Sequence, residues 1–481
     1  MISSLYRQNQ NTAQPLSGEN FAAKSQQSEI VIRKVPNLSV NMICSGPDTV
    51  HDIKWNCNGT MIMGSFPSQN EVRVWALADS EWSSILSMGV GGLSRAAWHP
   101  SNPTHLFLFS EFDTKMEIWD LAKSSQFIVP DVTSSVGLVE SNSKTQGIVF
   151  SSISRSVRVL DLRPSEEPKI IHEFTIGKGP SELAGARWNS DDLGFVAWGS
   201  PLESRLFHYD LKGTLISEID LYPSIPGSIT SRPLGVSCVA YNRDVLFVGT
   251  YNSTVQILSL RGSLSVLAEF SLNEPTLIVI DDLPNVYRES LGGSSTVMER
   301  NLFHVGGSVA GNYPVQYRAV IPQKSPKIEG LSTLNIPLSD PTRLGVDTDK
   351  SDPPACGITQ LLLSTDGRYL SCVSHRRPSV AFIYDLAKLR LSVVLIHRLP
   401  IMNLSWSPVD VRPTSRLCIT TGDSRIFIWS ATDCGNVIEM KEKAFKPTIG
   451  TWAANGRCIL LSDEKQTCCV TLDDEYVTIG G

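Results

Sequence analysis

A short pattern that returns along the chain constrains the fold more than any other feature of the sequence. Three alternating residues are followed by an aromatic or aliphatic residue, a small or acidic residue, and an aliphatic residue. The clear copies are residues 72–77, 116–121, 157–162, 206–211, 255–260, 381–386 and 426–431, and weaker copies at 30–35 and 467–472 extend the series toward both ends. Such self-similarity indicates one structural unit repeated many times.

The spacing of these copies identifies the kind of repeat. Their fourth residues stand at positions 33, 75, 119, 160, 209, 258, 384, 429 and 470, so successive copies lie 42, 44, 41, 49, 49, 126, 45 and 41 residues apart. A period of about 40–45 residues with a Trp-Asp-like strand end is typical of the WD repeat, whose blades have four antiparallel strands. The sequence therefore predicts an all-β WD-repeat β-propeller with seven to nine four-stranded blades.

A second pattern supports the blade interpretation. Another strand-like segment with its own aromatic residue and a following turn precedes each signature strand, as at Trp55, Trp98, Trp406 and Trp452. Asn58-Gly59 after the first of these is a hairpin-turn signal. We expect these aromatic side chains to wedge between neighbouring blades.

One interval breaks the period and sets the domain organisation. The step of 126 residues is three times 42, and the composition there shifts toward Gly, Pro and Ser. We interpret residues 261–356 as a long irregular insertion with some strands, and two decayed blades are the alternative. The other divisions are a polar N-terminal segment, 1–28, expected to be partly disordered, N-terminal blades over 29–260 and C-terminal blades over 357–475.

The best-formed copy carries a polar set that WD blades use to brace a pair of strands: His397, Thr420 (or Thr421), Asp423 and Trp429. An aspartate in a tight turn can accept a hydrogen bond from the imidazole, which also bonds the hydroxyl, which reaches the indole nitrogen. A catalytic Asp-His-Thr arrangement would use the same atoms. The bracing role is favoured because such networks lock a fold wherever they are fully satisfied.

Composition restricts the classes of function. The net charge is −6, and no run of five or more like charges occurs, which disfavours nucleic-acid binding. No secretory signal is visible and the longest apolar runs have strand length, so we expect a cytoplasmic protein without membrane association. The ten cysteines lack Cys-x-x-Cys spacing and are expected to be reduced structural thiols.

The motifs that carry common chemistry are absent from the sequence. It contains no Gly-x-x-x-x-Gly-Lys-Ser/Thr phosphate loop, no Gly-x-Ser-x-Gly elbow, and no His-x-x-x-His or His-x-His pair for zinc. The glycine cluster at 89–92 is interpreted as a turn, because no helix follows it. We therefore expect no enzyme activity, no catalytic residue, no cofactor and no metal.

Two stretches resemble a known family. The first is 71–82, Glu-Val-Arg-Val-Trp-Ala-Leu-Ala-Asp-Ser-Glu-Trp, continuing through 92–93 and 110–112. The second contains Lys-Leu-Arg-Leu at 388–391 and Thr-Gly-Asp-Ser-Arg at 421–425. On these residues the chain resembles the family of WD-repeat protein eight, the WD-repeat protein encoded antisense to a tumour-suppressor gene, a component of spindle poles and centriolar satellites. The resemblance runs loosely from about 15 to 470, with departures at 127–156 and 260–357.

The resemblance implies a non-enzymatic scaffold at the centrosome and spindle pole. It implies a coiled-coil anchoring protein as partner, and a minus-end kinesin as a further partner. The implied work is to anchor microtubule minus ends, assist assembly of the mitotic spindle and support cilium formation. Among the family-matching residues, Trp82, Glu111 and Phe112 are candidate partner-binding residues, because exposed aromatic residues often anchor interfaces. Burial between blades is the alternative for each.

Two other classes of function are alternatives to the scaffold. A substrate receptor of a cullin-type ubiquitin ligase would end a blade in Trp-Asp-x-Arg, which only Leu160-Asp161-Leu162-Arg163 approximates, without the Trp. An enzymatic propeller would need metal or triad residues that converge on the central channel, and the sequence contains no such cluster.

Overall fold

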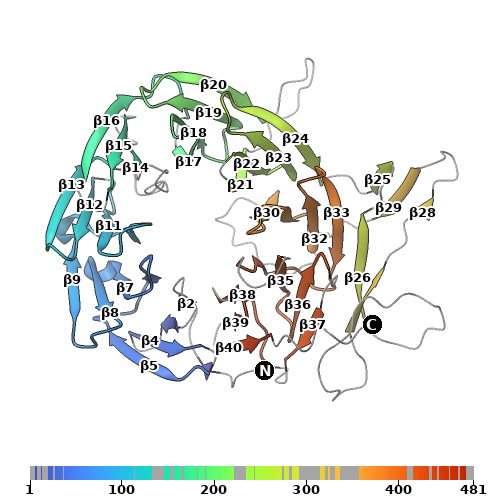
Figure 1. Ribbon diagram of the computed structural model, residues 1–481, viewed down its shortest axis with the longest axis horizontal. Coiled ribbons are helices and arrows are strands. Elements are labelled where there is room, and N and C mark those ends of the chain that lie inside the picture. The colour runs from blue at the N-terminus through green and yellow to red at the C-terminus, as the bar shows by residue number, and fades with distance from the viewer. Residues whose placement is uncertain are drawn as a thin grey trace. The chain divides into compact units, whose positions relative to one another are not determined.

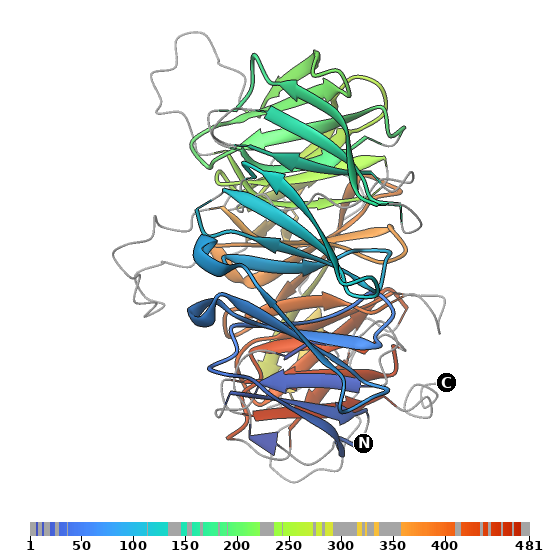
Figure 2. The same ribbon diagram turned by 90° about the vertical axis from the view of Figure 1, so that its left-hand side faces the viewer.

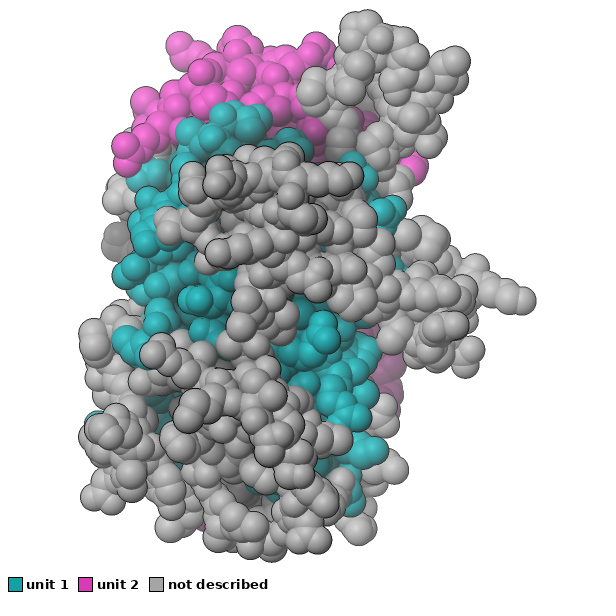
Figure 3. Space-filling model, turned by 90° about the vertical axis from the view of Figure 1, so that its right-hand side faces the viewer, with its two compact units in different colours: residues 1–5, 236–258, 266–481 teal, residues 6–235, 259–265 magenta. Residues whose placement is uncertain are grey.

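Two compact units of β-sheet make up the protein. Figure 3 colours unit 1 (1–5, 236–258 and 266–481) teal and unit 2 (6–235 and 259–265) magenta. The computed structural model describes residues 6–7, 12–13, 20–24, 28–35, 37–112, 114–132, 146–151, 156–163, 167–180, 183–189, 191–221, 235–242, 244–272, 276–280, 284–291, 315–319, 323–324, 331–335, 357–408, 415–432, 436–440, 444–453, 456–463 and 466–472. Within these ranges the helical elements are two short 3-10 helices.

Unit 2 contains five consecutive blade sheets within its described residues, drawn in blue to green in Figure 1. Strands that are neighbours in sequence are neighbours in each sheet. They are β2 (Thr12–Ala13), β3 (Asn20–Lys24), β4 (Glu29–Lys34) and β5 (Val40–Ser45); β6 (Asp52–Trp55), β7 (Met61–Phe66), β8 (Glu71–Ala76) and β9 (Ser83–Ser87); β10 (Arg95–Trp98), β11 (His105–Phe109), β12 (Lys115–Asp120) and β13 (Ser125–Pro130); β14 (Gln146–Phe150), β15 (Ser156–Asp161) and β16 (Lys169–Thr175); and β17 (Leu183–Trp188), β18 (Gly194–Gly199), β19 (Arg205–Asp210) and β20 (Leu215–Asp220). The unit also contains β1 (Tyr6–Arg7) and the 3-10 helices η1 (Pro67–Gln69) and η2 (Gly89–Gly91).

Unit 1 contains four more blade sheets in its described part. Their strands are β21 (Val236–Tyr241), β22 (Val245–Thr250), β23 (Thr254–Ser259) and β24 (Ser265–Ser271); β30 (Ile358–Leu363), β31 (Tyr369–Ser374), β32 (Arg377–Asp385) and β33 (Arg390–Ile396); β34 (Asn403–Trp406), β35 (Arg416–Thr420), β36 (Arg425–Ser430) and β37 (Asn436–Glu439); and β38 (Ile449–Trp452), β39 (Cys458–Ser462) and β40 (Gln466–Thr471). With the five of unit 2, the described residues form nine blades, at the upper end of the predicted range.

The repeated sequence pattern corresponds to one strand of each blade. Its nine copies fall on β4, β8, β12, β15, β19, β23, β32, β36 and β40. In β12 the alternation places Met116 and Ile118 against Val129 and Phe109 in one core cluster. The period of two therefore sends alternate side chains to opposite faces of the sheet, and both faces of β12 are packed, since Glu117 between Met116 and Ile118 is only 3% exposed.

Tryptophans join successive blades in the way that the sequence predicts. The indole Nε1 of Trp98 donates to the carbonyl oxygen of Lys54 in the preceding blade at 2.9 Å. Trp452 donates in the same way to Ser405, at 3.0 Å. Each aromatic ring thus fills the space between two sheets while its polar nitrogen is satisfied by the neighbouring backbone, which fixes one sheet against the next.

The interval that breaks the period adds strands to an existing blade. Beyond β24, β26 (Asn285–Leu291) pairs in parallel with β33, and β27 (Val315–Ala319) pairs with β26, so this blade has six strands. A separate three-stranded sheet contains β25 (Thr276–Ile280), β28 (Gln323–Lys324) and β29 (Leu331–Asn335). Among the described residues the interval forms these added strands in place of two decayed blades.

Both boundaries around the blades differ from those expected. Phe21, Ala22 and Ala23 of β3 are fully buried, so the first blade begins inside the segment 1–28 that the sequence analysis set apart as polar. The short run of apolar residues is enough to pair with β4. At the other boundary, β24 extends the N-terminal blades past residue 260.

Candidate interaction sites

The four residues of the predicted bracing set lie in unit 1 around one blade. His397 follows β33, Thr420 ends β35, Asp423 lies in the turn before β36, and Trp429 is within β36. His397, Thr420 and Trp429 are buried. The imidazole of His397 meets the ring of Phe427 edge-on, with the ring centroids 4.6 Å apart.

Other residues supply the contacts that hold three members of this set. The Thr420 hydroxyl donates to the carbonyl oxygen of Thr448 at 2.8 Å, which ties the blade to the following one. Asp423 accepts from Nε of Arg425 at 3.0 Å and from the backbone N–H of Ser424. The indole of Trp429 packs edge-on against Tyr369 and Trp406. The Asp-His-Thr-Trp relay itself stays a prediction.

Burial sets the chemistry of His397. Loss of hydration in the interior lowers the pKa of its imidazole to about 3, because the charged form cannot be solvated there. At neutral pH the ring is therefore uncharged, and a base this weak and this enclosed is poorly suited to take a proton from a substrate. This environment fits a structural role better than the catalytic alternative.

A buried carboxylate from the interval 261–356 contacts the same blade. One oxygen of Glu289, on β26, lies 3.3 Å from Nη1 of Arg425, and its other oxygen accepts from the backbone N–H of Arg398 at 2.9 Å. The Glu289 side chain is only 4% exposed. Sequence reasoning missed this residue because it lies where the family resemblance fails. The signal that could have identified Glu289 is its position two residues after Tyr287, because alternate residues of a strand-like run lie on the same face.

The three predicted partner-binding residues separate into two places in unit 2. Trp82 is partly buried and packs against the core shared by the sheets of β8 and β11, which fits the alternative role, burial between blades. Glu111 is exposed, and Phe112 is 71% exposed, in the turn between β11 and β12. That turn and the turn before β9 lie at opposite ends of the strands. The structure therefore does not bring Trp82 together with the other two.

Hydrogen bonds join the turns around Phe112. The backbone N–H of Glu111 donates to the carbonyl oxygen of Gly91, in η2, at 3.2 Å. Asn70, which ends η1, accepts from the backbone N–H groups of Met88 and Leu93. Figure 2 shows both short helices, in blue, protruding on one side of unit 2. The glycine cluster at 89–92 is thus a turn between two blades, as predicted, and it positions the turn that carries Glu111.

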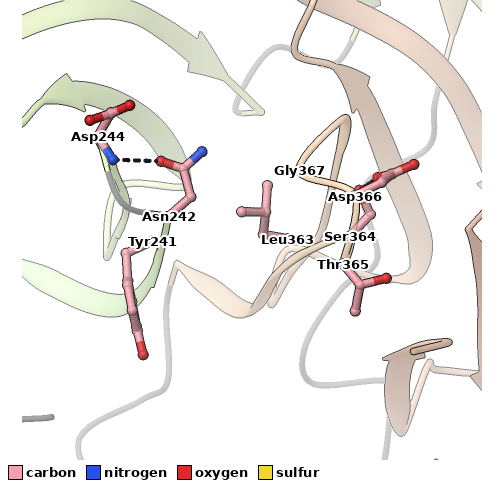
Figure 4. Close-up of a pocket in the computed structure, with 8 residues that line it drawn as sticks. All are labelled: Tyr241, Asn242, Asp244, Leu363, Ser364, Thr365, Asp366 and Gly367. Atoms are coloured by element: carbon pink, nitrogen blue, oxygen red, sulfur yellow. Dashed lines mark hydrogen bonds between the residues drawn. The ribbon is translucent and has the colours of Figure 1, made fainter. Parts of the chain in front are cut away.

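A separate polar pocket of about 540 Å³ lies in unit 1 between two hairpin turns. Tyr241, Asn242 and Asp244 line one side, and residues 363–367 line the other (Figure 4). The side chains that project into it are largely engaged in shaping their own turns. Asn242 accepts from the backbone N–H of Asp244 at 3.0 Å, and Asp366 accepts from the hydroxyl of Ser364 at 2.5 Å.

The lining of this pocket does not form a recognisable catalytic set. Its hydroxyl groups, on Tyr241, Ser364 and Thr365, have no histidine among the lining residues to act as a base. Thr365 donates to the carbonyl oxygen of Ser407 at 2.8 Å. Across the described part of the chain, no group of three or more His, Cys, Asp or Glu residues is arranged to hold a metal ion. None of the helices in that part has the length and apolar character to cross a membrane.

In the segment that approximates a ligase-receptor motif, the basic and acidic side chains pair with each other. In Leu160-Asp161-Leu162-Arg163, the guanidinium of Arg163 donates three hydrogen bonds to the Asp161 carboxylate, the shortest of them 2.7 Å. This pairing lowers the pKa of Asp161. Leu160 is fully buried, so the position where such receptors carry Trp is part of the core.

The repeat, the nine blades and the interblade tryptophans define a WD-repeat β-propeller protein. The chain is similar to the mouse WD repeat-containing protein WRAP73, with 24% identity over 470 residues that cover 94% of this chain and 92% of the mouse protein. No protein-family model matches the chain.

A solved structure supports the same fold class. The crystal structure of Saccharomyces cerevisiae Sqt1 is similar with a TM-score of 0.51 and 7% identity, over 92% of this chain and 98% of that one. The C-terminal WD40 domain of Sif2 has a TM-score of 0.49 and 10% identity, over 98% and 99% of the two chains. At this identity the likeness to Sqt1 concerns the fold alone.

Proposed function

We propose that this WD-repeat protein is a non-enzymatic scaffold of the centrosome and spindle pole. In the cytoplasm it binds a coiled-coil anchoring protein, with a minus-end kinesin as a further partner. Through these partners it anchors microtubule minus ends, assists spindle assembly and supports cilium formation. The general part of this proposal follows from the fold, since WD-repeat propellers generally act as scaffolds for protein–protein interaction.

The observation that carries the proposal is the extent of the similarity to the mouse relative. It covers 94% of this chain, so it includes the blades of both units and is not confined to one generic repeat. The residues of the resemblance, at 71–82 and 421–425, lie on signature strands and the turns beside them. The neutral, buried His397 and the lining of the unit 1 pocket favour binding over catalysis.

Affinity purification of the tagged full-length protein from dividing cells, combined with mass spectrometry and imaging, tests the proposal. We expect to recover a coiled-coil centrosomal or spindle-pole protein and to see the tagged protein in foci at the poles. Recovery of a cullin ligase with a diffuse signal would contradict the scaffold and favour the receptor alternative. A variant of the self-paired motif, Arg163→Ala, would then show whether that motif contributes to ligase binding.

A further inference from the structure

Two large apolar side chains are exposed on joined turns of unit 2. Val90, in η2, is fully exposed, and Phe112 is 71% exposed. The hydrogen bond between Gly91 and Glu111 links the residue after Val90 to the residue before Phe112. Single exposed apolar residues are ordinary on protein surfaces. Two on hydrogen-bonded turns form a small patch, which we define as Val90, Glu111 and Phe112 and call the end patch.

Buried contacts beneath the end patch hold both turns in place. The hydroxyl of Ser110, which is fully buried, accepts from the backbone N–H groups of Thr114 and Lys115 at 2.9 and 3.0 Å, closing the turn that carries Phe112. On the other turn, Met88 and Leu93 flank the glycine cluster and are buried in the core. Docking on such fixed turns loses little conformational entropy, which favours binding.

Glycine allows the two turns to meet. A side chain at Gly92, where φ is +65°, would come within 2.7 Å of the Glu111 carboxylate and 2.9 Å of its Cβ. Gly92 therefore leaves space for Glu111 beside η2. A bulkier residue would displace Glu111 and separate the turns, so the end patch depends on this position.

The charged residue of the end patch is acidic, and the exposed Arg95 lies on the strand beside it, where it pairs with Phe109. Glu111 is exposed within the end patch, and Asp131 is exposed on the next turn, whose backbone N–H donates to Thr114 at 2.7 Å. The cation on this turn, Lys115, is neutralised by Glu117, with Nζ and the carboxylate oxygen 2.6 Å apart. An exposed carboxylate such as that of Glu111, beside an apolar anchor, is complementary to a partner that carries both apolar and basic side chains.

We propose that the end patch docks a short segment of a partner protein in which a large aliphatic or aromatic residue is flanked by Lys or Arg. The apolar residue would pack against Val90 and Phe112, and the basic residue would pair with Glu111. This inference rests on the proposed scaffold function and deepens it by naming the docking surface and the chemistry of the segment.

Photocrosslinking in dividing cells tests the inference on the full-length protein. Val90 is replaced by p-benzoylphenylalanine, and the crosslinked peptides are sequenced by mass spectrometry. The matched control carries the same probe at Leu193, which is 60% exposed in the turn between β17 and β18, at the other end of the strands of its blade. We expect the probe at 90, and not at 193, to crosslink to a segment that has an apolar residue flanked by Lys or Arg.

Substitutions in the end patch provide the second measurement. Phe112→Ala should reduce recovery of the crosslinked partner at least about tenfold, as loss of an interface anchor does. Glu111→Lys should reduce it too, and more strongly at low salt. Leu193→Ala should leave it unchanged.

Three outcomes would overturn the inference. They are a crosslink to an acidic segment, a crosslink to a second copy of this chain, and recovery that is the same for Phe112→Ala as for the native protein. If the native protein still captures its partners in the last case, the scaffold function stands and only the end patch is wrong. If the native protein captures no partner, the proposed function fails together with the inference.

Discussion

The turn between the second and third strands has opposite chemistry in two blades, one from each unit. Between β35 and β36 of unit 1 the turn is enclosed: Asp423 contacts Arg425, which contacts the buried Glu289 of β26. Between β11 and β12 of unit 2 the equivalent turn exposes Phe112. One repeat position can therefore be closed by another segment of the chain or left open to solvent. The open turn is the one suited to binding a partner.

The largest expected difference between these two blades is in the free energy of unfolding that is lost when a phenylalanine is replaced by alanine. Phe427 of β36 is 1% exposed and packs against His397, so Phe427→Ala should lower the free energy of unfolding by about 3–5 kcal/mol. Phe112→Ala, on the open turn, should change it by less than about 0.5 kcal/mol. Chemical denaturation of both variants measures the difference. Similar losses in the two variants would mean that the turn at Phe112 is not open.

Removal of the Glu289 carboxylate tests how the enclosed turn is held. Glu289→Gln should lower the free energy of unfolding by about 1.5–3 kcal/mol, because the largely buried Arg425 keeps Asp423 but loses its contact with a buried anion. The control is Asp52→Asn, which removes an anion from an exposed pair with Lys54, whose side chains are 37% and 40% exposed. That loss should be less than about 1 kcal/mol. Equal effects in the two variants would contradict a closing role for β26.

These two regions also show how far the sequence could predict the molecule. The repeat located the strands and their neighbours because its alternation places side chains on opposite faces of each sheet, as with Met116 and Ile118 of β12, which share one core cluster. Its aromatic residues located the interblade contacts, such as the one from Trp98 to Lys54. Local pattern and tertiary structure agree wherever one blade repeats another.

The contacts around the polar set could not be predicted in the same way. The partner of Thr420 and one of the two acidic partners of Arg425 come from residues outside the repeat copy, namely Thr448 and Glu289. Glu289 is 136 residues from Arg425 and lies where the periodicity stops. A motif predicts which residue types gather, whereas long-range pairing depends on how an irregular interval returns to the sheet. Sequence could also propose both Phe112 and Trp82 as interface residues, but it could not show that Phe112 is exposed whereas Trp82 packs against a core.

Acid should weaken the enclosed region through His397. Burial lowers the pKa of its imidazole from its ordinary value of 6.5 to about 3 in the folded protein. The unfolded chain therefore takes up a proton near pH 6.5 that the folded chain does not. The stability contributed by this neutral histidine is present above pH 6.5 and is lost as the pH falls toward 3.

The measurement is the free energy of unfolding as a function of pH for the native protein and His397→Gln. Between pH 4 and 6 the native slope should exceed that of the variant by about 1.4 kcal/mol per pH unit, corresponding to one proton. Part of the slope should persist in the variant, because burial also lowers the pKa of His99 in unit 2 to about 4. Identical slopes would show that His397 is accessible to protons in the folded state.

The smallest expected effect compares a threonine beside the enclosed turn with a threonine on the open turn. The hydroxyl of Thr420, which is fully buried, donates to the Thr448 carbonyl at 2.8 Å. Thr420→Val keeps the shape of the side chain but leaves that carbonyl without its donor, so the free energy of unfolding should fall by about 1–3 kcal/mol. Thr114 is exposed on the open turn, and its hydroxyl contacts Ser110 at 3.0 Å.

Water can replace the hydroxyl contact in Thr114→Val, so this change should lie within about 0.5 kcal/mol. Thermal and chemical unfolding of the two variants, made in the same background, separate the enclosed from the open environment without altering side-chain volume. A loss at Thr114 equal to that at Thr420 would mean that both turns are closed, and the exposed position of Phe112 would then not qualify as a docking surface. A loss confined to Thr420 would leave the turn of Phe112 as the one that is free to bind a partner.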